Sequence, residues 1–324
     1  MYGHTEPLSG AEPIMKTLIL THESCLQHDT GAGHPESPAR LQAVLDRLRQ
    51  PDFAGLEWRQ APRATLEQIK RLHDPTYVDQ VLASIPDQGL THLDGDTVVC
   101  PESGEAALRA AGAACAAVDA ILRGEAGRAF CPVRPPGHHA EPDQAMGFCL
   151  FNNVAIAAVH ARERHHLDRV AIIDFDVHHG NGTEAMLRSR QGYLYASSHE
   201  HPLYPGTGSG PLPGVNNVFN VPLGRMTGSE EFRDRFRGEI LPPVRAFGPQ
   251  LLFISAGFDA HASDPLAGLD LEAEDFAWAT AELVAIADRF ANGAVISCLE
   301  GGYDLRALAE CSAAHVRALM AGDG

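Results

Sequence analysis

Short apolar runs of strand length alternate with helical stretches along most of this chain. The apolar runs, which are rich in β-branched residues, cover residues 16–20, 128–133, 169–173, 193–197, 218–221, 251–255 and 294–299. Helical patterns lie between most of them, at residues 37–48, 103–122, 153–163, 183–188, 230–241 and 272–291. Strands that are apolar along their whole length are buried on both faces, and strands that alternate with helices form parallel sheets. The pattern therefore predicts an α/β fold of three layers, in which helices flank a mainly parallel central sheet.

The chain has 324 residues, a length that fits either two average domains or one large α/β domain. No Ser/Gly-rich linker and no block of like charges divides it, so we predict a single domain over residues 16–324. Residues 1–15 contain no apolar core of the signal-peptide type, and we predict that they form a flexible leader.

Acidic residues outnumber basic ones, with 42 Asp and Glu against 25 Lys and Arg, which gives a net charge of −17. Such a surface repels phosphate backbones, so we expect no nucleic-acid partner. A negative field suits a cationic partner instead, such as a lysine-rich peptide or a polyamine. The longest apolar runs fall well short of the ~20 residues that a membrane span needs, so no membrane partner is expected either.

The seven cysteines are widely spaced and include no CxxC pair. An odd number at such spacings indicates neither a disulfide framework nor a zinc ribbon, and it favours a reducing compartment such as the cytoplasm. The oligomeric state stays open, and a homo-oligomer is compatible with the sequence.

Imidazoles, carboxylates and a phenol follow the ends of five predicted strands. In open parallel sheets, ligands bind beyond the carboxyl ends of the strands. We therefore expect these side chains to converge on one site at one edge of the sheet. The residues concerned are His138, His139, Asp174, Asp176, His178, His199, Asp259, Glu300 and Tyr303.

The segment after residue 173 has the composition of a metal site. In an extended segment, Asp174, Asp176 and His178 point the same way. Asp259 arrives from another strand, and one imidazole with two carboxylates makes a three-ligand zinc or iron site with an open position. We predict that Asp176, His178 and Asp259 bind the metal and that Asp174 supports them. The alternative is that this segment only caps the next helix, since Thr183 follows in a glycine-rich turn.

A tandem pair of histidines, His138 and His139, follows the rigid turn Pro-Pro-Gly. Beside a metal, two imidazoles make a natural acid/base device because their pKa lies close to neutrality. Asp174 can orient one ring, and Asn181 is a candidate for the other. The alternative is a solvated loop pair, which is how we interpret the two histidines at 165–166, in a charged stretch with no strand before it.

Tyr303 follows two glycines, which let the backbone bring a phenol close to a bound ligand. A phenol in that place can donate a hydrogen bond to a developing oxyanion. The alternative is a buried tyrosine after a strand.

Taken together, these segments resemble the histone deacetylase family, whose members have the arginase–deacetylase fold. The resemblance runs from about residue 16 to the end. The motifs that carry it are RPPGHHA (134–140), GFC (147–149), IDFDVHHGNGT (173–183), PGTG (205–208), SAGFDAH (255–261), DPLA (264–267) and LEGGY (299–303). The segment HDTGAGHPESPAR (28–40) resembles the entry loop of the class II branch and its bacterial relatives, and Asn181 and Glu300 point the same way.

The resemblance implies a zinc-dependent enzyme that hydrolyses the amide of acylated lysine side chains to a free amine and acetate, with Fe²⁺ as the other candidate ion. It implies that Asp176, His178 and Asp259 bind the zinc ion, which agrees with the ligands inferred from the residues. His139 is then the general base and acid, and His138 is its electrostatic partner, held by Asp174. Tyr303 polarises the acyl carbonyl. A structural potassium ion is also implied, bound by Asp174, Ser197 and main-chain carbonyls of Asp176, His178 and Ser198.

The resemblance also implies residues that contact the substrate. Phe148 and Tyr204 line a narrow tunnel, the carbonyl of Gly147 accepts the substrate amide N–H, and Arg40 lies in an inner acetate channel. Leu266 stands where the polyamine-selective branch has a glutamate, which argues against a strict polyamine specialist. Val99 stands where some members place an acid that holds the substrate main chain, which leaves peptide selectivity open.

Three other functions stay open. The same site serves acetylpolyamines, other small acylamides and longer acyl chains. An arginase-like hydrolase with two metal ions is disfavoured, because the sequence holds a single D-x-H and no further carboxylate-rich metal motif. A non-catalytic protein that binds acyl-lysine is disfavoured because His138, His139 and Tyr303 are all present.

Overall fold

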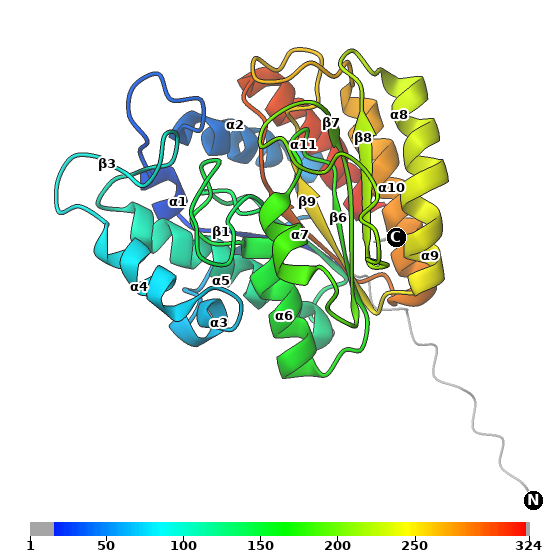
Figure 1. The fold of residues 1–324 in the computed structure, drawn as a ribbon, viewed down its shortest axis with the longest axis horizontal. Coiled ribbons are helices and arrows are strands. Elements are labelled where there is room, and N and C mark those ends of the chain that lie inside the picture. Colours follow the sequence, from blue (N-terminus) through cyan, green and yellow to red (C-terminus); the bar gives the residue numbers. More distant parts are fainter. Residues whose placement is uncertain (1–15, 322–324) are drawn as a thin grey trace, which may run out of the picture.

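Eight parallel strands form one central sheet in the computed structural model, which describes residues 16–321 (Figure 1). Across the sheet, their order is β2 (Glu57–Gln60), β1 (Thr17–Thr21), β5 (Arg128–Cys131), β10 (Val295–Leu299), β9 (Leu251–Ala256), β6 (Val170–Asp174), β7 (Tyr193–Glu200) and β8 (Val218–Leu223). A short antiparallel pair, β3 (Thr91–His92) and β4 (Val98–Val99), stands apart from it. The predicted α/β class with a mainly parallel sheet is confirmed. The predicted leader, residues 1–15, lies outside the described residues.

The central strands are buried along their whole length, as their apolar sequences predict. Every residue of β6 (VAIID), β9 (LLFISA) and β10 (VISCL) is buried. Helices on both faces of a parallel sheet leave no room for a polar face, which is why these strands do not alternate between polar and apolar residues.

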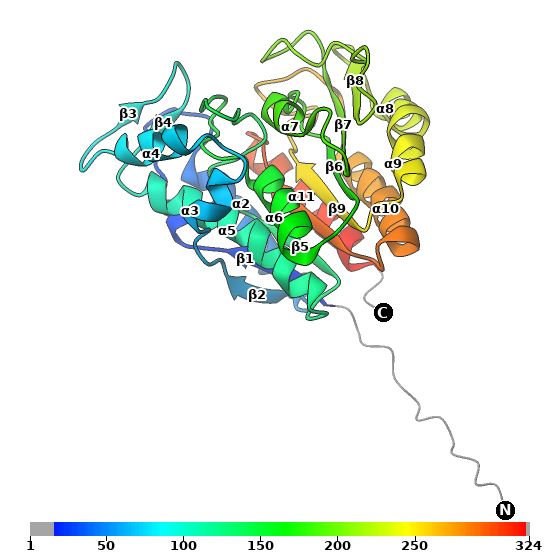
Figure 2. The same ribbon diagram turned by 60° about the horizontal axis from the view of Figure 1, so that its bottom comes forward.

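The direction of each crossover decides which face a helix covers. The connections that contain α5 (Ser103–Leu122) and α6 (Asn153–His165) run across the sheet in one direction, from β2 to β5 and from β5 to β6. The connection through α10 (Ala273–Phe290) runs in the opposite direction, from β9 to β10. Because crossovers are right-handed, α10 lies on the opposite face from α5 and α6 (Figure 2). There it packs against α11 (Leu305–Met320), which in turn contacts α2 (Pro38–Leu48).

The remaining helices are short. They are α1 (Ser24–Gln27), α3 (Leu66–Lys70), α4 (Pro75–Ala83), α7 (Asn181–Leu187), α8 (Ser229–Arg235) and α9 (Leu241–Phe247), with a 3₁₀ turn, η1 (Pro51–Phe53), and a π-helical turn, η2 (Phe236–Ile240). The helix predicted at residues 230–241 is therefore divided. The π-helical turn follows α8, and two prolines in the first turn of α9 begin a new helix, a position where proline is well tolerated.

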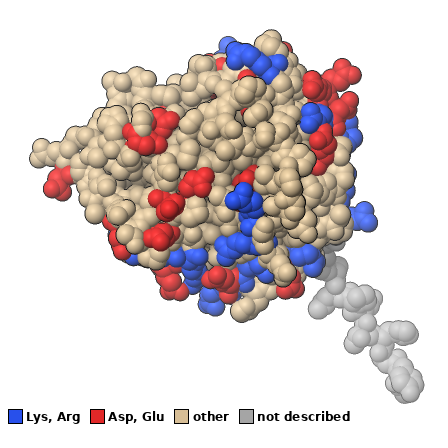
Figure 3. Space-filling view, in the orientation of Figure 1, with Lys and Arg blue, Asp and Glu red and all other residues tan. Residues whose placement is uncertain are grey.

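Charged side chains of both signs are spread over the surface. Figure 3 shows acidic side chains gathered over α8, whose first turn carries Glu230 and Glu231, while Lys and Arg gather along the lower edge of the same view among acidic side chains. This face therefore carries no continuous basic track of the kind that follows a nucleic-acid backbone. Within residues 16–321, no helix combines the length and the apolar character that crossing a membrane requires.

A buried ion network ties the loop after β5 to the rest of the fold. Glu36 forms an ion pair with Arg134, in the segment that leads to the histidine pair, and another with Arg40, 2.9 Å from its Nη1; all three side chains are fully buried. Burial would raise the pKa of the Glu36 carboxyl, but the guanidinium of Arg134 and hydrogen bonds from His28 and Arg134 hold it well below its usual range. The carboxylate therefore stays ionised between two buried cations.

Replacing Glu36 by glutamine is expected to lower the free energy of unfolding by about 3 kcal/mol, because two buried guanidinium groups lose their counter-charge. Urea unfolding followed by circular dichroism measures the change. Glu57→Gln is the matched control, since Glu57 pairs with Lys16 and Arg59 at the surface, and we expect it to change the free energy by less than about 1 kcal/mol. Equal effects of the two substitutions would refute the structural role of the buried network.

Candidate active site

Four neighbouring strands at the centre of the sheet carry the predicted site residues at their carboxyl ends. These strands, β5, β10, β9 and β6, are adjacent in the sheet, so the loops that follow them meet at one edge. The loops bring together His138 and His139 after β5, Tyr303 after β10, Asp259 after β9, and Asp174, Asp176 and His178 at the end of β6.

Asp176, His178 and Asp259 form a compact group of buried ligand atoms. Nδ1 of His178 lies 3.1 Å from Oδ1 of Asp176 and 3.1 Å from Oδ2 of Asp259. The ligand atoms of all three residues lie within 4.8 Å of one another. Asp174 stands beside this group: its Oδ1 accepts the backbone N–H of Asp176 at 3.0 Å.

The chemistry of this group fits a divalent transition ion. The carboxylates of Asp176 and Asp259 are completely buried, and buried carboxylates need a nearby positive charge. Burial alone would lower the pKa of His178, but its hydrogen bonds to the two carboxylates raise that pKa to about 10. The protonated imidazole then supplies the positive charge that the two carboxylates need, at the place where a metal ion would supply it. A Cβ atom on Gly301 would lie 2.0 Å from Oδ2 of Asp259, so only glycine fits beside the carboxylates. Two carboxylates and one imidazole are ligands that suit zinc or iron.

The two histidines after β5 have different partners. Nδ1 of His138 lies 3.0 Å from Oδ2 of Asp174, and Nδ1 of His139 lies 2.8 Å from Oδ1 of Asn181. The Nδ2 of Asn181 donates to Glu141 at 2.6 Å, which fixes the amide with its oxygen toward His139. His139 therefore carries its proton on Nδ1, and its Nε2 is free to accept another.

These environments push the protonation of the two rings in opposite directions. Burial would lower the pKa of His138, but the carboxylates of Asp176 and Asp174 raise it to about 10. Burial lowers the pKa of His139 well below its ordinary value, and the neighbouring rings of His138 and His178 lower it further. At neutral pH the pair thus consists of a cationic His138 and a neutral His139. A neutral imidazole is what a general base requires.

Tyr303 is held by its backbone and by both sides of its ring. Its N–H donates to Oδ2 of Asp264 at 2.7 Å. The ring meets Phe148 edge-on at 5.9 Å between centroids, and the Cζ atom of Arg40 lies 4.7 Å from the ring centroid. Burial raises the pKa of the phenol well above its ordinary value, although the Arg40 guanidinium opposes this. The hydroxyl therefore keeps its proton and can donate it in a hydrogen bond.

Arg40 lies behind the loop that carries Tyr303. Its Nε donates to the carbonyl of Gly302 and its Nη2 to the carbonyl of Glu300, each at 2.6 Å. In this structure it positions the tyrosine loop, and its role in an acetate channel stays a prediction.

A cavity of about 240 Å³ connects these groups to the surface. Tyr204 and Leu266 are 39% and 37% exposed, so they lie at its mouth, whereas His139 and His178 are buried and lie at its floor. The predicted substrate-contact residues Gly147, Phe148, Tyr204 and Leu266 thus share one cavity with the imidazoles. The lining residues are Asp96, His139, Gly147, Phe148, His178, Leu203, Tyr204, Leu266 and Tyr303.

A left-handed turn shapes one wall of this cavity. Gly147 and Phe148 have φ values of 56° and 67°. A Cβ atom on Gly147 would lie 2.4 Å from Cδ2 of His139, so the close approach of this loop to the ring requires glycine. Phe148 adopts a conformation that is uncommon for a bulky residue, and its N–H donates to Oγ1 of Thr97 at 3.2 Å.

The acid at the cavity is Asp96, which the sequence analysis missed. Val99, predicted to stand in the place of a substrate-holding acid, is completely buried in β4 and does not line the cavity. Asp96 precedes it by three residues, in the loop between β3 and β4. Burial and the neighbouring Asp94 raise the pKa of Asp96. Asp96 does not follow an apolar run of strand length, because its loop joins the two short strands of the antiparallel pair. The pattern that identified the other site residues therefore could not identify this one.

Glu300 has a positioning role that its place in the sequence did not indicate. Its Oε2 accepts the backbone N–H groups of Gly137 and His138, at 2.6 and 3.1 Å. The carboxylate thereby ties the histidine loop to the end of β10.

The residues predicted to bind potassium lie on adjacent strands. Asp174 is in register with Ser197 across β6 and β7. Oγ of Ser197 lies 2.8 Å from Nδ1 of His199. Oγ of Ser198 is buried and has no hydrogen-bond partner in the described part of the chain. The potassium site stays a prediction.

Comparisons with known proteins agree on one family. The family model described as "Histone deacetylase domain" matches residues 34–319. The chain is 39% identical to the histone deacetylase-like amidohydrolase of Pseudomonas aeruginosa, over 93% of this chain and 81% of that protein. It is 41% identical to an uncharacterized protein of Synechocystis, over 93% of this chain and 99% of that protein.

Longer and solved relatives extend this likeness. The chain is 35% identical to the type-2 histone deacetylase 2 of Dictyostelium discoideum over 94% of its own length, but it spans only 21% of that protein. The crystal structure of the HDA15 HD domain superposes with a TM-score of 0.89 at 33% identity, and the match covers 95% of this chain and 89% of the other.

Proposed function

Because the chain belongs to the histone deacetylase family, a family of deacetylase and amidohydrolase enzymes, we propose that it is a zinc-dependent deacylase acting on acylated lysine side chains. The products are a free amine and acetate or the corresponding longer acid. One observation carries the proposal: His139, Tyr303 and His178 of the metal-ligand group line the same cavity. The lowered pKa of His139 and the raised pKa of Tyr303 suit them as base and hydrogen-bond donor. We place the reaction in the cytoplasm.

The cavity fits a thin, uncharged chain that ends in an amide. Phe148 and Tyr204 offer aromatic surfaces on which the methylene groups of a lysine side chain pack. The backbone carbonyl of Gly147, beside His139, accepts the amide N–H of the substrate. At the rim, the carboxylate of Asp96 accepts hydrogen bonds from the substrate main chain or pairs with a cationic group.

The metal ion in this proposal is zinc, with iron as the alternative, and its ligands are Asp176, His178 and Asp259. Such an ion would polarise the acyl carbonyl and lower the pKa of a water molecule towards ~7. A potassium ion bound near Asp174 and Ser197 would hold the end of β6 that carries the zinc ligands.

The protein supplies the proton transfers. Nε2 of His139 accepts a proton as water attacks the acyl carbon, and it returns that proton to the leaving amine. His138 stays cationic beside Asp174 and stabilises the negative charge that develops nearby. The phenol of Tyr303 donates a hydrogen bond to the developing oxyanion.

An acetylpolyamine amidohydrolase is the second candidate, favoured by the acid at the rim, Asp96, and by the net charge of −17. A panel of an acetyl-lysine peptide and acetylspermidine with zinc-loaded protein separates the two candidates. We expect a higher kcat/KM for the peptide, because the apolar Leu266 stands at the mouth. A preference for acetylspermidine would overturn the lysine assignment, and binding of both without acetate release would show a non-catalytic binding protein.

Leu266 itself gives a sharper test of selectivity. Replacing it by glutamate is expected to raise the ratio of kcat/KM for acetylspermidine over the peptide by about threefold to fivefold, because an exposed carboxylate gains a modest attraction to a polyamine cation. Leu266→Gln is the control, because glutamine has the shape of glutamate without its charge. It is expected to leave the ratio unchanged. A ratio that moves equally in both variants would show that shape, and not charge, governs the choice.

A further inference from the structure

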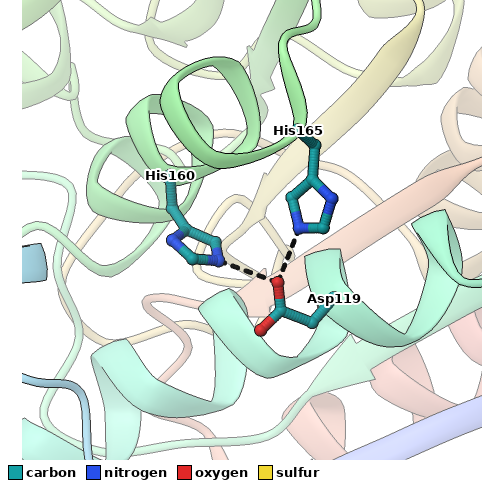
Figure 4. A group of neighbouring side chains, drawn as sticks. All are labelled: Asp119, His160 and His165. Carbon is teal, nitrogen blue, oxygen red and sulfur yellow. Dashed lines mark hydrogen bonds and ion pairs between the residues drawn. The ribbon is translucent and has the colours of Figure 1, made fainter.

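A second cluster of metal-ligand side chains lies away from the active site, between α5 and α6. Asp119 of α5 faces His160 and His165 of α6 (Figure 4). Nε2 of His160 lies 2.9 Å and Nε2 of His165 lies 2.6 Å from the same oxygen, Oδ1 of Asp119. The interpretation of the histidines at 165–166 as a solvated loop pair is therefore wrong for His165, which is the last residue of α6.

The geometry presents three ligand atoms to one point. The ligand atoms of the three side chains lie within 4.8 Å of one another, as they do in the group formed by Asp176, His178 and Asp259. Nε2 of Gln68 lies 3.3 Å from Nδ1 of His160 and donates to it, so the ring proton of His160 lies on Nε2 and points to Asp119. An ion bound through Nε2 requires that this proton move to Nδ1 and that the Gln68 amide turn its oxygen toward the ring to accept it, as the partner of a metal-binding histidine does.

The backbone around this cluster also favours a cation. Asp119 lies in the last turn of α5, and His165 ends α6, so two helix C-termini meet there. Each C-terminus carries a partial negative charge, and a carboxylate in a last turn adds to it. Among the described residues, the last turn of α5 contains no basic side chain, whereas that of α6 also carries Arg162 and Arg164, of which Arg162 donates to the carbonyls of Leu167 and Gln191. The side chains of Asp119 and His165 are 33% and 22% exposed, so an ion from solvent can reach them.

We propose that Asp119, His160 and His165 form a second site for a divalent transition ion such as Zn²⁺, separate from the catalytic centre. Each imidazole exchanges its hydrogen bond to Asp119 for a bond to the ion through Nε2, and water completes the coordination. Helix α6 begins at Asn153, whose side chain donates to the carbonyl of Pro135 in the loop of the histidine pair. The histidine loop therefore contacts the N-terminal end of α6 and the second site lies toward its C-terminal end, in a helix about 20 Å long at 1.5 Å per residue. An ion at the second site would fasten α6 to α5.

Zinc stoichiometry of the full-length protein tests this site. After dialysis against dilute Zn²⁺, mass spectrometry of the bound metal is expected to give about two zinc ions per chain for the wild type and about one for His165→Asn. His166→Asn is the matched control, because His166 is exposed and follows the helix, and it is expected to keep about two. His165→Asn is also expected to retain wild-type deacylase activity, since His165 takes no part in the cavity.

A second pair of variants isolates the new site. The double variant Asp176→Asn/Asp259→Asn is expected to bind about one zinc ion, and Asp119→Asn added to it is expected to remove that ion. Zinc is also expected to raise the Tm of the double variant but not of the triple variant. The proposal is overturned if the double variant binds no zinc, or if His165→Asn binds as much as the wild type, because the cluster is then only a pair of hydrogen bonds.

Discussion

Replacing His139 by alanine is expected to lower kcat for deacylation by about a thousandfold, because general acid–base catalysis contributes roughly that factor. Of the described imidazoles, two line the cavity, and only that of His139 has a lowered pKa. No other lining residue can therefore replace it as the base. Steady-state kinetics on an acetyl-lysine peptide measure the loss. KM is expected to change little, since the walls that hold the side chain remain.

A control for the loss of an imidazole is His92→Ala, at an exposed position in β3. We expect it to keep wild-type kcat. The metal content of His139→Ala is expected to equal that of the wild type, because His139 is not among the three ligand residues. Retention of more than about a tenth of wild-type kcat would assign the base elsewhere, since general-base catalysis accounts for at least about a hundredfold.

Replacing Tyr303 by phenylalanine is expected to lower kcat by about 10²- to 10³-fold, the usual effect of removing one oxyanion donor. The substitution removes only the hydroxyl. The ring keeps its contacts with Phe148 and Arg40, and the backbone N–H keeps its bond to Asp264. The dissociation constant of a non-hydrolysable acetyl-lysine analogue is therefore expected to stay within about threefold, since an apolar contact is retained.

Tyr204→Phe is the matched control for this variant, because it removes a phenol hydroxyl from the mouth of the same cavity. We expect kcat to fall by less than about threefold, since the substitution removes only the hydroxyl and the ring keeps its edge-on contact with His139 at 5.2 Å between centroids. Equal losses in the two variants would show that Tyr303 contributes to the shape of the cavity and not to the oxyanion.

The central part of the site follows from the sequence because strand topology decides where its residues lie. The loops after β5, β6, β9 and β10 each begin where an apolar run ends, and parallel strands bring those ends to one edge. The extended segment predicted after Asp174 is wrong, because the chain bends there: Oδ1 of Asp174 accepts the N–H of Asp176, and Oδ1 of Asp176 accepts the N–H of His178. The partners expected for the histidine pair, Asp174 and Asn181, lie at hydrogen-bond distance from His138 and His139.

Other parts could not be predicted because they depend on tertiary packing. Strand β2 (EWRQ) is a polar strand at the edge of the sheet, so it has no apolar run to mark it. Asp96 comes from the loop of a two-stranded pair that only the folded chain brings to the cavity. His165 lies five residues after His160, a spacing that does not place two side chains on one helix face. Their convergence on Asp119 arises from the packing of α6 on α5.

The proposed activity depends most on one ion shared by Asp176, His178 and Asp259. Diffraction from crystals of the zinc-loaded protein, measured at the zinc absorption edge, tests this directly. A single anomalous peak within bonding distance of all three side chains, on the cavity side next to His139 and Tyr303, is the predicted result. The absence of a peak there, or a pair of ions bridged by these carboxylates as in a dinuclear hydrolase, would contradict the proposed site.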